Sequence, residues 1–203
     1  MQARSFKVTI VMTQSSRPMR YIFTMKRAHT ALLFLILGIV LVPAVGWLYL
    51  HFGHPPVAVA DPMLPGEEQI ARSALLARVD EERPRNNPVP INEATLQEGA
   101  SIYMSECAFC HGVPAIQSSV GVNTFPKTPQ FFRRHATGSR PPDLADRAAS
   151  YHWFVENGVR LTAMPSFKHV LTDREQWEVA NLLAMSETPL PESVKKVLAG
   201  STD

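Results

Sequence analysis

The longest apolar stretch of the chain covers residues 31–50, which read ALLFLILGIVLVPAVGWLYL and include no charged residue. A helix of this length spans about 30 Å, the thickness of the hydrocarbon core of a bilayer. Pro43 would weaken a helix in water but is tolerated in lipid, and Trp47 lies near one end, where amphipathic rings favour the interface. The pattern predicts a transmembrane anchor over residues 31–52.

Charge predicts the orientation of this anchor. Residues 1–30 hold six basic residues and no acidic one, and no Lys or Arg follows the span until Arg72. The positive-inside rule therefore places 1–30 in the cytoplasm and the rest of the chain on the periplasmic side of a bacterial cytoplasmic membrane. A cleaved signal peptide ending at Ala60 is the alternative, but this site lies further beyond the apolar run than cleavage normally allows. We expect the anchor to be retained.

Prolines dominate residues 53–90, which we expect to be a linker. Within the linker, residues 67–82 have the spacing of a short amphipathic helix, which either packs on the following domain or has no packing partner.

The formal net charge of the whole chain is only +2, which gives no general case for nucleic-acid binding.

Helical periods then organise residues 91–190, with residues 191–203 as a C-terminal tail. Asn92 can cap a first helix, whose apolar face runs at spacings of three and four to Cys107. A second helix is predicted at 147–157, and a third follows a capping box at 172–175. No run alternates well enough to predict a strand. Composition supports a folded domain, since 45% of the residues are hydrophobic, and we expect a small all-α domain.

One motif carries specific chemistry. The segment Cys107-Ala108-Phe109-Cys110-His111 has the C-x-x-C-H pattern of covalent haem c attachment. Two thiols three positions apart on a helical turn can each bond one vinyl group of the same porphyrin, and the next residue can offer its imidazole to the iron. A zinc site would need about four ligands, yet the chain has only these two cysteines. A thioredoxin-type redox pair would need a βαβ context that is absent. We predict one haem c.

A haem that carries electrons needs a second axial ligand, and Met164 is the main candidate. It lies in a predicted loop between two helices, where a thioether can approach the far face of the haem, and His/Met ligation raises the reduction potential. Met185 falls within the third predicted helix, and we expect it to be a core residue. A bis-His haem using His135, His152 or His169 remains an alternative.

The chain resembles the class I c-type cytochromes over residues 91–188. Gly99, Tyr103 and Cys107 match the spacing of that family's glycine, aromatic residue and first cysteine, and the glycine lets the terminal helices of the family cross closely. The segment 151–167 is similar to the distal-ligand segment of single-haem bacterial members, and Trp177 fits the C-terminal helix. The resemblance implies a small helical domain around one covalently bound haem. Leu182 stands where many members have an aromatic residue facing the glycine.

The resemblance also implies that a proline carbonyl accepts the Nδ1–H of His111, which would orient the imidazole. Pro126, Pro129, Pro141 and Pro142 compete for this role, and loop length favours Pro129.

Two further side chains are candidates for contact with the haem. Arg160 could pair with a haem propionate or be solvated, and Trp153 could pack on the haem or in ordinary core. Residues 132–146 look like a polar surface insertion.

These features predict a membrane-tethered monohaem cytochrome c that transfers single electrons between a redox donor and acceptor, with His111 and Met164 binding the iron in both oxidation states. Such a carrier is not an enzyme and takes no small-molecule substrate. One alternative is a haem enzyme or gas sensor with an open sixth position. Another is a cytochrome subunit of a larger respiratory or dehydrogenase complex.

Overall fold

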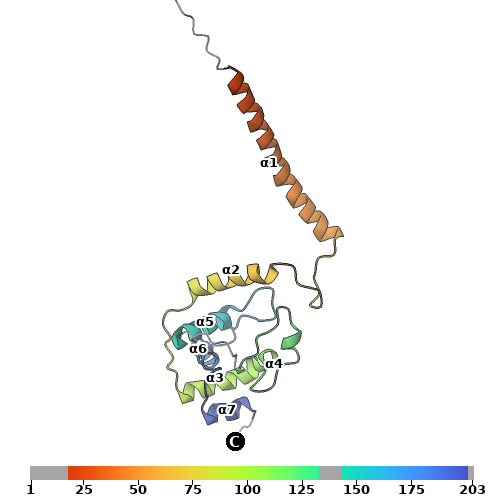
Figure 1. The fold of residues 1–203 in the computed structure, drawn as a ribbon. Helices are drawn as coiled ribbons and strands as arrows, with labels where there is room; N and C mark the ends of the chain where they lie inside the picture. Colours follow the sequence, from red (N-terminus) through yellow and green to blue (C-terminus); the bar gives the residue numbers. More distant parts are fainter. Residues whose placement is uncertain (1–17, 133–142, 201–203) are drawn as a thin grey trace, which may run out of the picture. The chain divides into compact units, whose positions relative to one another are not determined.

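The computed structural model of the chain describes residues 18–132 and 143–200. Within these ranges it contains seven α-helices, one short 3₁₀ helix and no β-strand, which confirms the predicted all-α class (Figure 1). The chain divides into two compact units, Met1–Pro56 and Val57–Asp203. His135, Pro141 and Pro142 lie outside the described residues.

Helix α1, Pro18–Phe52, contains the predicted anchor. Its portion His29–Phe52 has a mean hydropathy of 2.6 and no buried residues, and is long and apolar enough to cross a membrane. The helix begins well before the apolar run, at a proline, which suits the first turn because the N–H groups there have no helical partner. Pro43 lies inside the helix and cannot donate to the preceding turn.

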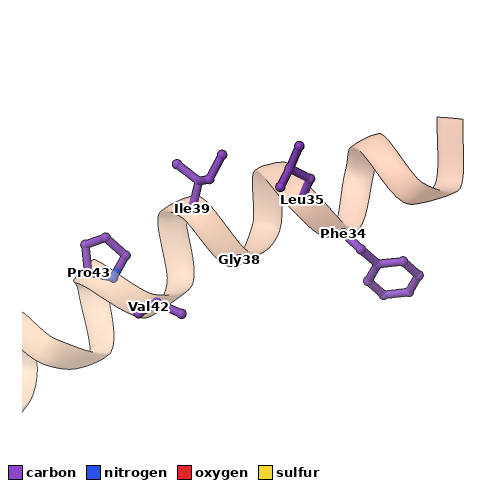
Figure 2. A pocket seen from close by; sticks show the side chains of 6 residues that line it. All are labelled: Phe34, Leu35, Gly38, Ile39, Val42 and Pro43. Atoms are coloured by element: carbon purple, nitrogen blue, oxygen red, sulfur yellow. The ribbon is translucent and has the colours of Figure 1, made fainter. Parts of the chain in front are cut away.

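A shallow apolar hollow marks the middle of α1, where Gly38 contributes no side chain (Figure 2). Its lining is entirely apolar and consists of Phe34, Leu35, Gly38, Ile39, Val42 and Pro43. Such a surface would be costly to expose to water but matches lipid.

Helix α2, Glu67–Glu82, packs on α5, Leu144–Asn157, which settles the two alternatives left for this segment. Val79 is buried in the contact. The indole Nε1–H of Trp153 donates to the Glu82 carboxylate at 3.1 Å, and Arg83 lies 3.6 Å from the Asp146 carboxylate. Part of the predicted linker therefore belongs to the folded unit.

Capping boxes begin the two helices that form the centre of the domain. Helix α3, Glu93–Glu106, begins after Asn92, whose side chain accepts from the Thr95 N–H while Thr95 bonds back to the Asn92 backbone. Helix α6, Asp173–Ala184, begins in the same way, with Thr172 and Glu175 as partners. Each box satisfies two backbone N–H groups that the helix cannot satisfy itself.

Helices α3 and α6 cross in contact at Gly99. A Cβ atom at this position would overlap the main-chain carbonyl of Glu178 and lie 3.2 Å from the Val179 nitrogen. Gly99 thus faces the main chain of α6, while Leu182 is fully buried in the core beside the crossing. The crossing glycine implied by the family resemblance is present.

Helix α7, Glu192–Leu198, closes the same core by packing on α3. Val194 and Leu198 are fully buried with Tyr103 and Leu182. The segment predicted as a tail therefore supplies core residues.

His152 on α5 is a buried polar residue between α5 and α6, with 3% of its surface exposed. Its ring stacks on Trp177, with centroids 4.1 Å apart, and its Nε2–H donates to Asp173 at 3.1 Å. Nδ1 is buried and has no hydrogen-bond partner among the described residues. Burial lowers the pKa of His152, and the Asp173 and Glu156 carboxylates oppose this shift.

Replacing Gly99 with alanine is expected to destabilise the domain. Alanine favours a helix by about 1 kcal/mol over glycine, but the Cβ would force two main chains apart, which costs about 1–3 kcal/mol and more where backbone rather than side chain must move. The expected net result is a lower melting temperature in thermal unfolding. Ser101→Ala, on the exposed face of the same helix, should change the free energy of unfolding by no more than about 0.5 kcal/mol. Equal stabilities for Gly99→Ala and the wild type would contradict the close crossing.

The buried His152 predicts that stability falls in acid. A His pKa lowered by folding means that the unfolded chain binds more protons, so this part of the stability is present above about pH 6.5 and is lost as the pH falls below that value. The free energy of unfolding, measured by denaturant titration at a series of pH values, should decrease below this point. The decrease should be shallower in His152→Phe. Parallel curves for the two proteins would show that His152 is not responsible.

Candidate functional site

Helix α4, Ala108–His111, is a single turn that follows α3 directly, with Cys107 at the junction. The N–H groups of Cys110 and His111 both donate to the Cys107 carbonyl, at 3.1 and 2.9 Å. At about 100° per residue, Cys107, Cys110 and His111 fall on one side of this turn and Phe109 on the opposite side. Both cysteines are free thiols and half-buried, so the two sulfurs and the imidazole are available together.

The imidazole of His111 is oriented by a backbone carbonyl. Its Nδ1 lies 2.8 Å from the carbonyl oxygen of Pro129, so Nδ1–H donates there and the Nε2 lone pair is left for a metal. The ring also stacks on Phe131, with centroids 4.8 Å apart. Burial lowers the pKa of His111, while the bond to Pro129 raises it. The net shift favours the neutral imidazole, the form that binds iron.

Three residues of the following loop bind the backbone of α4. The Ser118 hydroxyl donates to the Phe109 carbonyl, and the Gln130 side-chain amide donates to the Cys110 carbonyl at 3.1 Å. Gly121 packs directly against that same carbonyl, where any Cβ would overlap it. These contacts satisfy carbonyl groups that so short a helix leaves unpaired.

Two more interactions complete this support. The Gln130 side-chain oxygen accepts the Ser118 N–H at 2.8 Å, and the buried Tyr103 hydroxyl donates to the Gly112 carbonyl at 2.7 Å. Gly112 has φ +72°, a conformation that disfavours side chains. The backbone after His111 is therefore fixed from both α3 and the loop.

The Cys107 thiol lies in an apolar environment. Burial raises its pKa to about 12, and the charges of Glu106 and Cys110 act in the same direction. Cys107 is therefore a protonated thiol at neutral pH. Among the described residues, no group of three His, Cys, Asp or Glu side chains is placed to hold a metal ion.

Met164 lies in a loop that is held at both ends. Helix α5 ends at Gly158, with φ +66°, and a side chain there would overlap the backbone of Pro165 and Ser166 at 2.6–2.7 Å. The Met164 carbonyl accepts the Val159 N–H at 3.2 Å, and its N–H donates to the Thr162 hydroxyl at 3.1 Å. Met164 itself is half-buried. The loop thus fixes the backbone from which the thioether projects.

The remaining predicted residues lie in different settings. Arg160 is exposed next to this loop. Trp153 is buried and uses its indole N–H on Glu82 of α2, a contact that the sequence analysis did not anticipate. His169 is exposed, and His152 is bound to Asp173. Met185 caps the C-terminus of α6 and packs against the core.

Sequence reasoning also missed the side chains that support α4. Ser118, Gln130 and the Tyr103 hydroxyl carry no motif, and their contacts with α4 or Gly112 join residues at least nine positions apart. Tyr103 was predicted only as the aromatic residue of the family spacing, with no role for its hydroxyl. The available signal was the position of Gln130 between Pro129 and Phe131, a polar side chain between two apolar neighbours.

Residues 94–183 match the family described as "Cytochrome C oxidase, cbb3-type, subunit III". Comparison with curated proteins finds no match. The matched segment extends from the first turn of α3 to the last turn of α6, and so includes the Gly99 crossing, the C-x-x-C-H turn and Met164. Residues 94–183 therefore form a c-type cytochrome domain, of the kind that binds haem c covalently.

Proposed function

We propose that this chain is a membrane-tethered cytochrome with one haem c that transfers single electrons between redox proteins on the periplasmic side of the membrane. The observation that carries the proposal is the turn Cys107–His111, with two free thiols beside an imidazole whose Nδ1 is bonded to Pro129. The family match supports electron transfer by a c-type cytochrome domain.

The residues present fit haem c. Cys107 and Cys110 would each add S–H across one vinyl group, so that sulfur bonds one carbon and the hydrogen is placed on the other. His111 would bind the iron through Nε2, because Nδ1 is engaged by Pro129. The chain has two cysteines in total, enough for one such attachment.

Haem c supplies an iron that alternates between the ferric and ferrous states. The protein has to hold the ligands in the same positions in both states. At His111, the hydrogen bond to the Pro129 carbonyl and the bond from Gln130 to the Cys110 carbonyl serve this purpose. Met164 is the proposed sixth ligand, since its loop is tied to α5 by main-chain bonds. A soft, neutral thioether favours the ferrous state and raises the potential. With His111 and Met164 as its two protein ligands, the iron would have no position open to a substrate.

Helix α1 supports a location at the membrane. It is long and apolar enough to span a bilayer, and the basic residues before it favour an N-terminus in the cytoplasm. The cytochrome domain would then lie on the periplasmic side. Tethering keeps a carrier in two dimensions beside its partners and so raises its effective concentration.

A second candidate is a subunit of a larger oxidase or dehydrogenase complex. The description of the matched family favours it, because that description names an oxidase subunit. The chemistry at His111 and Met164 would be the same, and only the permanence of the partner would differ.

Expression in cells that attach haem c is expected to yield a protein that keeps its red colour after acid–acetone extraction. The pyridine haemochrome assay should give one haem per chain, and the intact mass should equal the chain plus one haem, with the residues of α1 included. Cys107→Ser with Cys110→Ser should abolish covalent attachment. Colour that washes out of the wild type would refute the haem c proposal, and a mass starting at Asp61 would refute the retained anchor.

Met164→Leu preserves side-chain volume but removes the sulfur. The expected result is a reduction potential lower by on the order of 100 mV or more, because axial ligands dominate haem potentials, together with binding of carbon monoxide by the ferrous protein. Met185→Leu is the matched control and should leave both properties unchanged. Rapid uptake of carbon monoxide by the wild type would instead support the alternative of an open sixth position.

A further inference from the structure

Leu161 has a backbone conformation that suits glycine. Its φ is +62°, in the left-handed region, where a bulky side chain is rare. It is the third residue of a turn closed by the Thr162 N–H, which donates to the Val159 carbonyl at 3.3 Å. A positive φ at the third position alone is typical of a type II turn, which favours Gly or Asn there. Leucine therefore strains this turn.

Packing does not offset the strain at Leu161. Its side chain is 94% exposed, so it gains little by burial. Phe132 also has a positive φ, but its ring packs against Tyr103 with centroids 5.2 Å apart. Because strained backbone clusters at ligand clamps and switch regions, the place of Leu161 in the loop that carries Met164 points to a role in ligation.

The strained turn is bonded to Met164 through Thr162. The Thr162 hydroxyl accepts the Met164 N–H at 3.1 Å and donates to the Val159 carbonyl at 2.8 Å. The Val159 N–H in turn donates to the Met164 carbonyl at 3.2 Å. Relaxation of Leu161 to a negative φ would move Thr162 and break these bonds. The backbone of Met164 therefore keeps its position only while Leu161 stays strained.

The segments on either side of this turn are fixed independently of it. Gly158 packs directly on the backbone of Pro165, and the Phe167 N–H donates to the Val155 carbonyl at 3.0 Å. Residues 159–164, which lie between these contacts, are exposed or half-buried. The turn can therefore relax without unfolding α5 or the core.

We infer that Leu161 is a positioning residue that weakens the hold of the loop on Met164, so that a small basic ligand such as imidazole can displace the thioether from the haem iron. The inference rests on the proposed electron-carrier function with Met164 as the sixth ligand. In the exchange, the bond from sulfur to iron breaks and a bond from the imidazole nitrogen forms, while the iron stays ferric and no electron is transferred. The strain that relaxation removes favours the open state of the loop.

Imidazole binding to the ferric, full-length holoprotein in detergent tests this inference, with the haem absorption spectrum as the readout. Leu161→Asn relieves the strain, because Asn tolerates a positive φ. Its affinity for imidazole should be about fivefold lower than that of the wild type, which corresponds to about 1 kcal/mol. Leu161→Ala is the matched control, since it also removes the leucine side chain but keeps the strain, and its affinity should equal the wild-type value. Equal affinities of Leu161→Asn and Leu161→Ala would overturn the inference.

Amide hydrogen exchange gives a readout that does not depend on the iron. The Thr162 N–H should exchange about fivefold more slowly in Leu161→Asn than in Leu161→Ala, because the relieved turn opens less often. The Phe167 N–H, outside the turn, should exchange equally in both variants. Equal exchange at Thr162 would contradict the strained turn itself.

Met164→Leu separates this inference from the proposed function. If this variant binds imidazole no more tightly than the wild type, Met164 is not the ligand and the proposed ligation fails. If it binds imidazole more tightly while Leu161→Asn and Leu161→Ala remain equal, only the role of Leu161 is refuted. An absent haem c in the wild type would refute the electron carrier, and exchange at Thr162 would still decide whether Leu161 strains the turn.

Discussion

The contact of two main chains at Gly99 is the constraint on which the rest of the domain depends. Because α3 meets α6 without an intervening side chain, the axis of α3 is fixed by backbone rather than by rotatable groups. Cys107 follows two turns later, about 12 Å along the same rigid helix. The crossing therefore positions the first attachment residue although it contributes no chemistry. It also places Tyr103, one turn after Gly99, where its hydroxyl reaches the Gly112 carbonyl.

Helix α4, the turn that carries Cys110 and His111, depends on neighbouring residues, because a helix of four residues is too short to be stable alone. Its stability comes from contacts with the Phe109 and Cys110 carbonyls and from the bond between His111 and Pro129. Each of these bonds contributes about 1 kcal/mol net, and together they leave the turn few alternative conformations. An electron carrier benefits from this arrangement, since ligands that stay in place keep the reorganisation energy small.

Sequence patterns predicted the parts of the structure that are determined locally. The caps at Asn92 and Thr172 were predicted because an N-cap side chain bonds to a backbone N–H only a few positions further along the chain. The C-x-x-C-H motif was recognised because its chemistry fits within one turn. Loop length also favoured Pro129, the proline whose carbonyl lies beside His111. The contact of Trp153 with Glu82 was not predictable, because it joins residues 71 positions apart.

The dependence on contacts between distant residues also explains why the predictions for α2 and α7 differ from the structure. Helix α2 and helix α7 have apolar patterns that are too short to reveal a partner, so the first was left with two alternatives and the second was assigned to a tail. In the structure, Val79 is buried against α5 and Val194 against α3. Burial of a short amphipathic helix depends on which surface the rest of the fold leaves uncovered, and that surface exists only after α3, α5 and α6 have assembled.

The docking of α2 has a consequence for the tether. With α2 part of the folded unit, the chain between α1 and α2 consists of residues 53–66, which can extend over at most about 50 Å. Several of these positions are further restricted, since the Asp61 carboxylate accepts the N–H groups of Val57 and Ala58 at 2.8 Å and prolines stiffen the rest. On the proposed membrane anchor, a cytochrome domain with such a tether would sample a thin layer above the membrane surface. Under that proposal, the contact between Trp153 and Glu82 would influence function indirectly, because releasing α2 would lengthen the tether and lower the effective concentration of the carrier beside its partners.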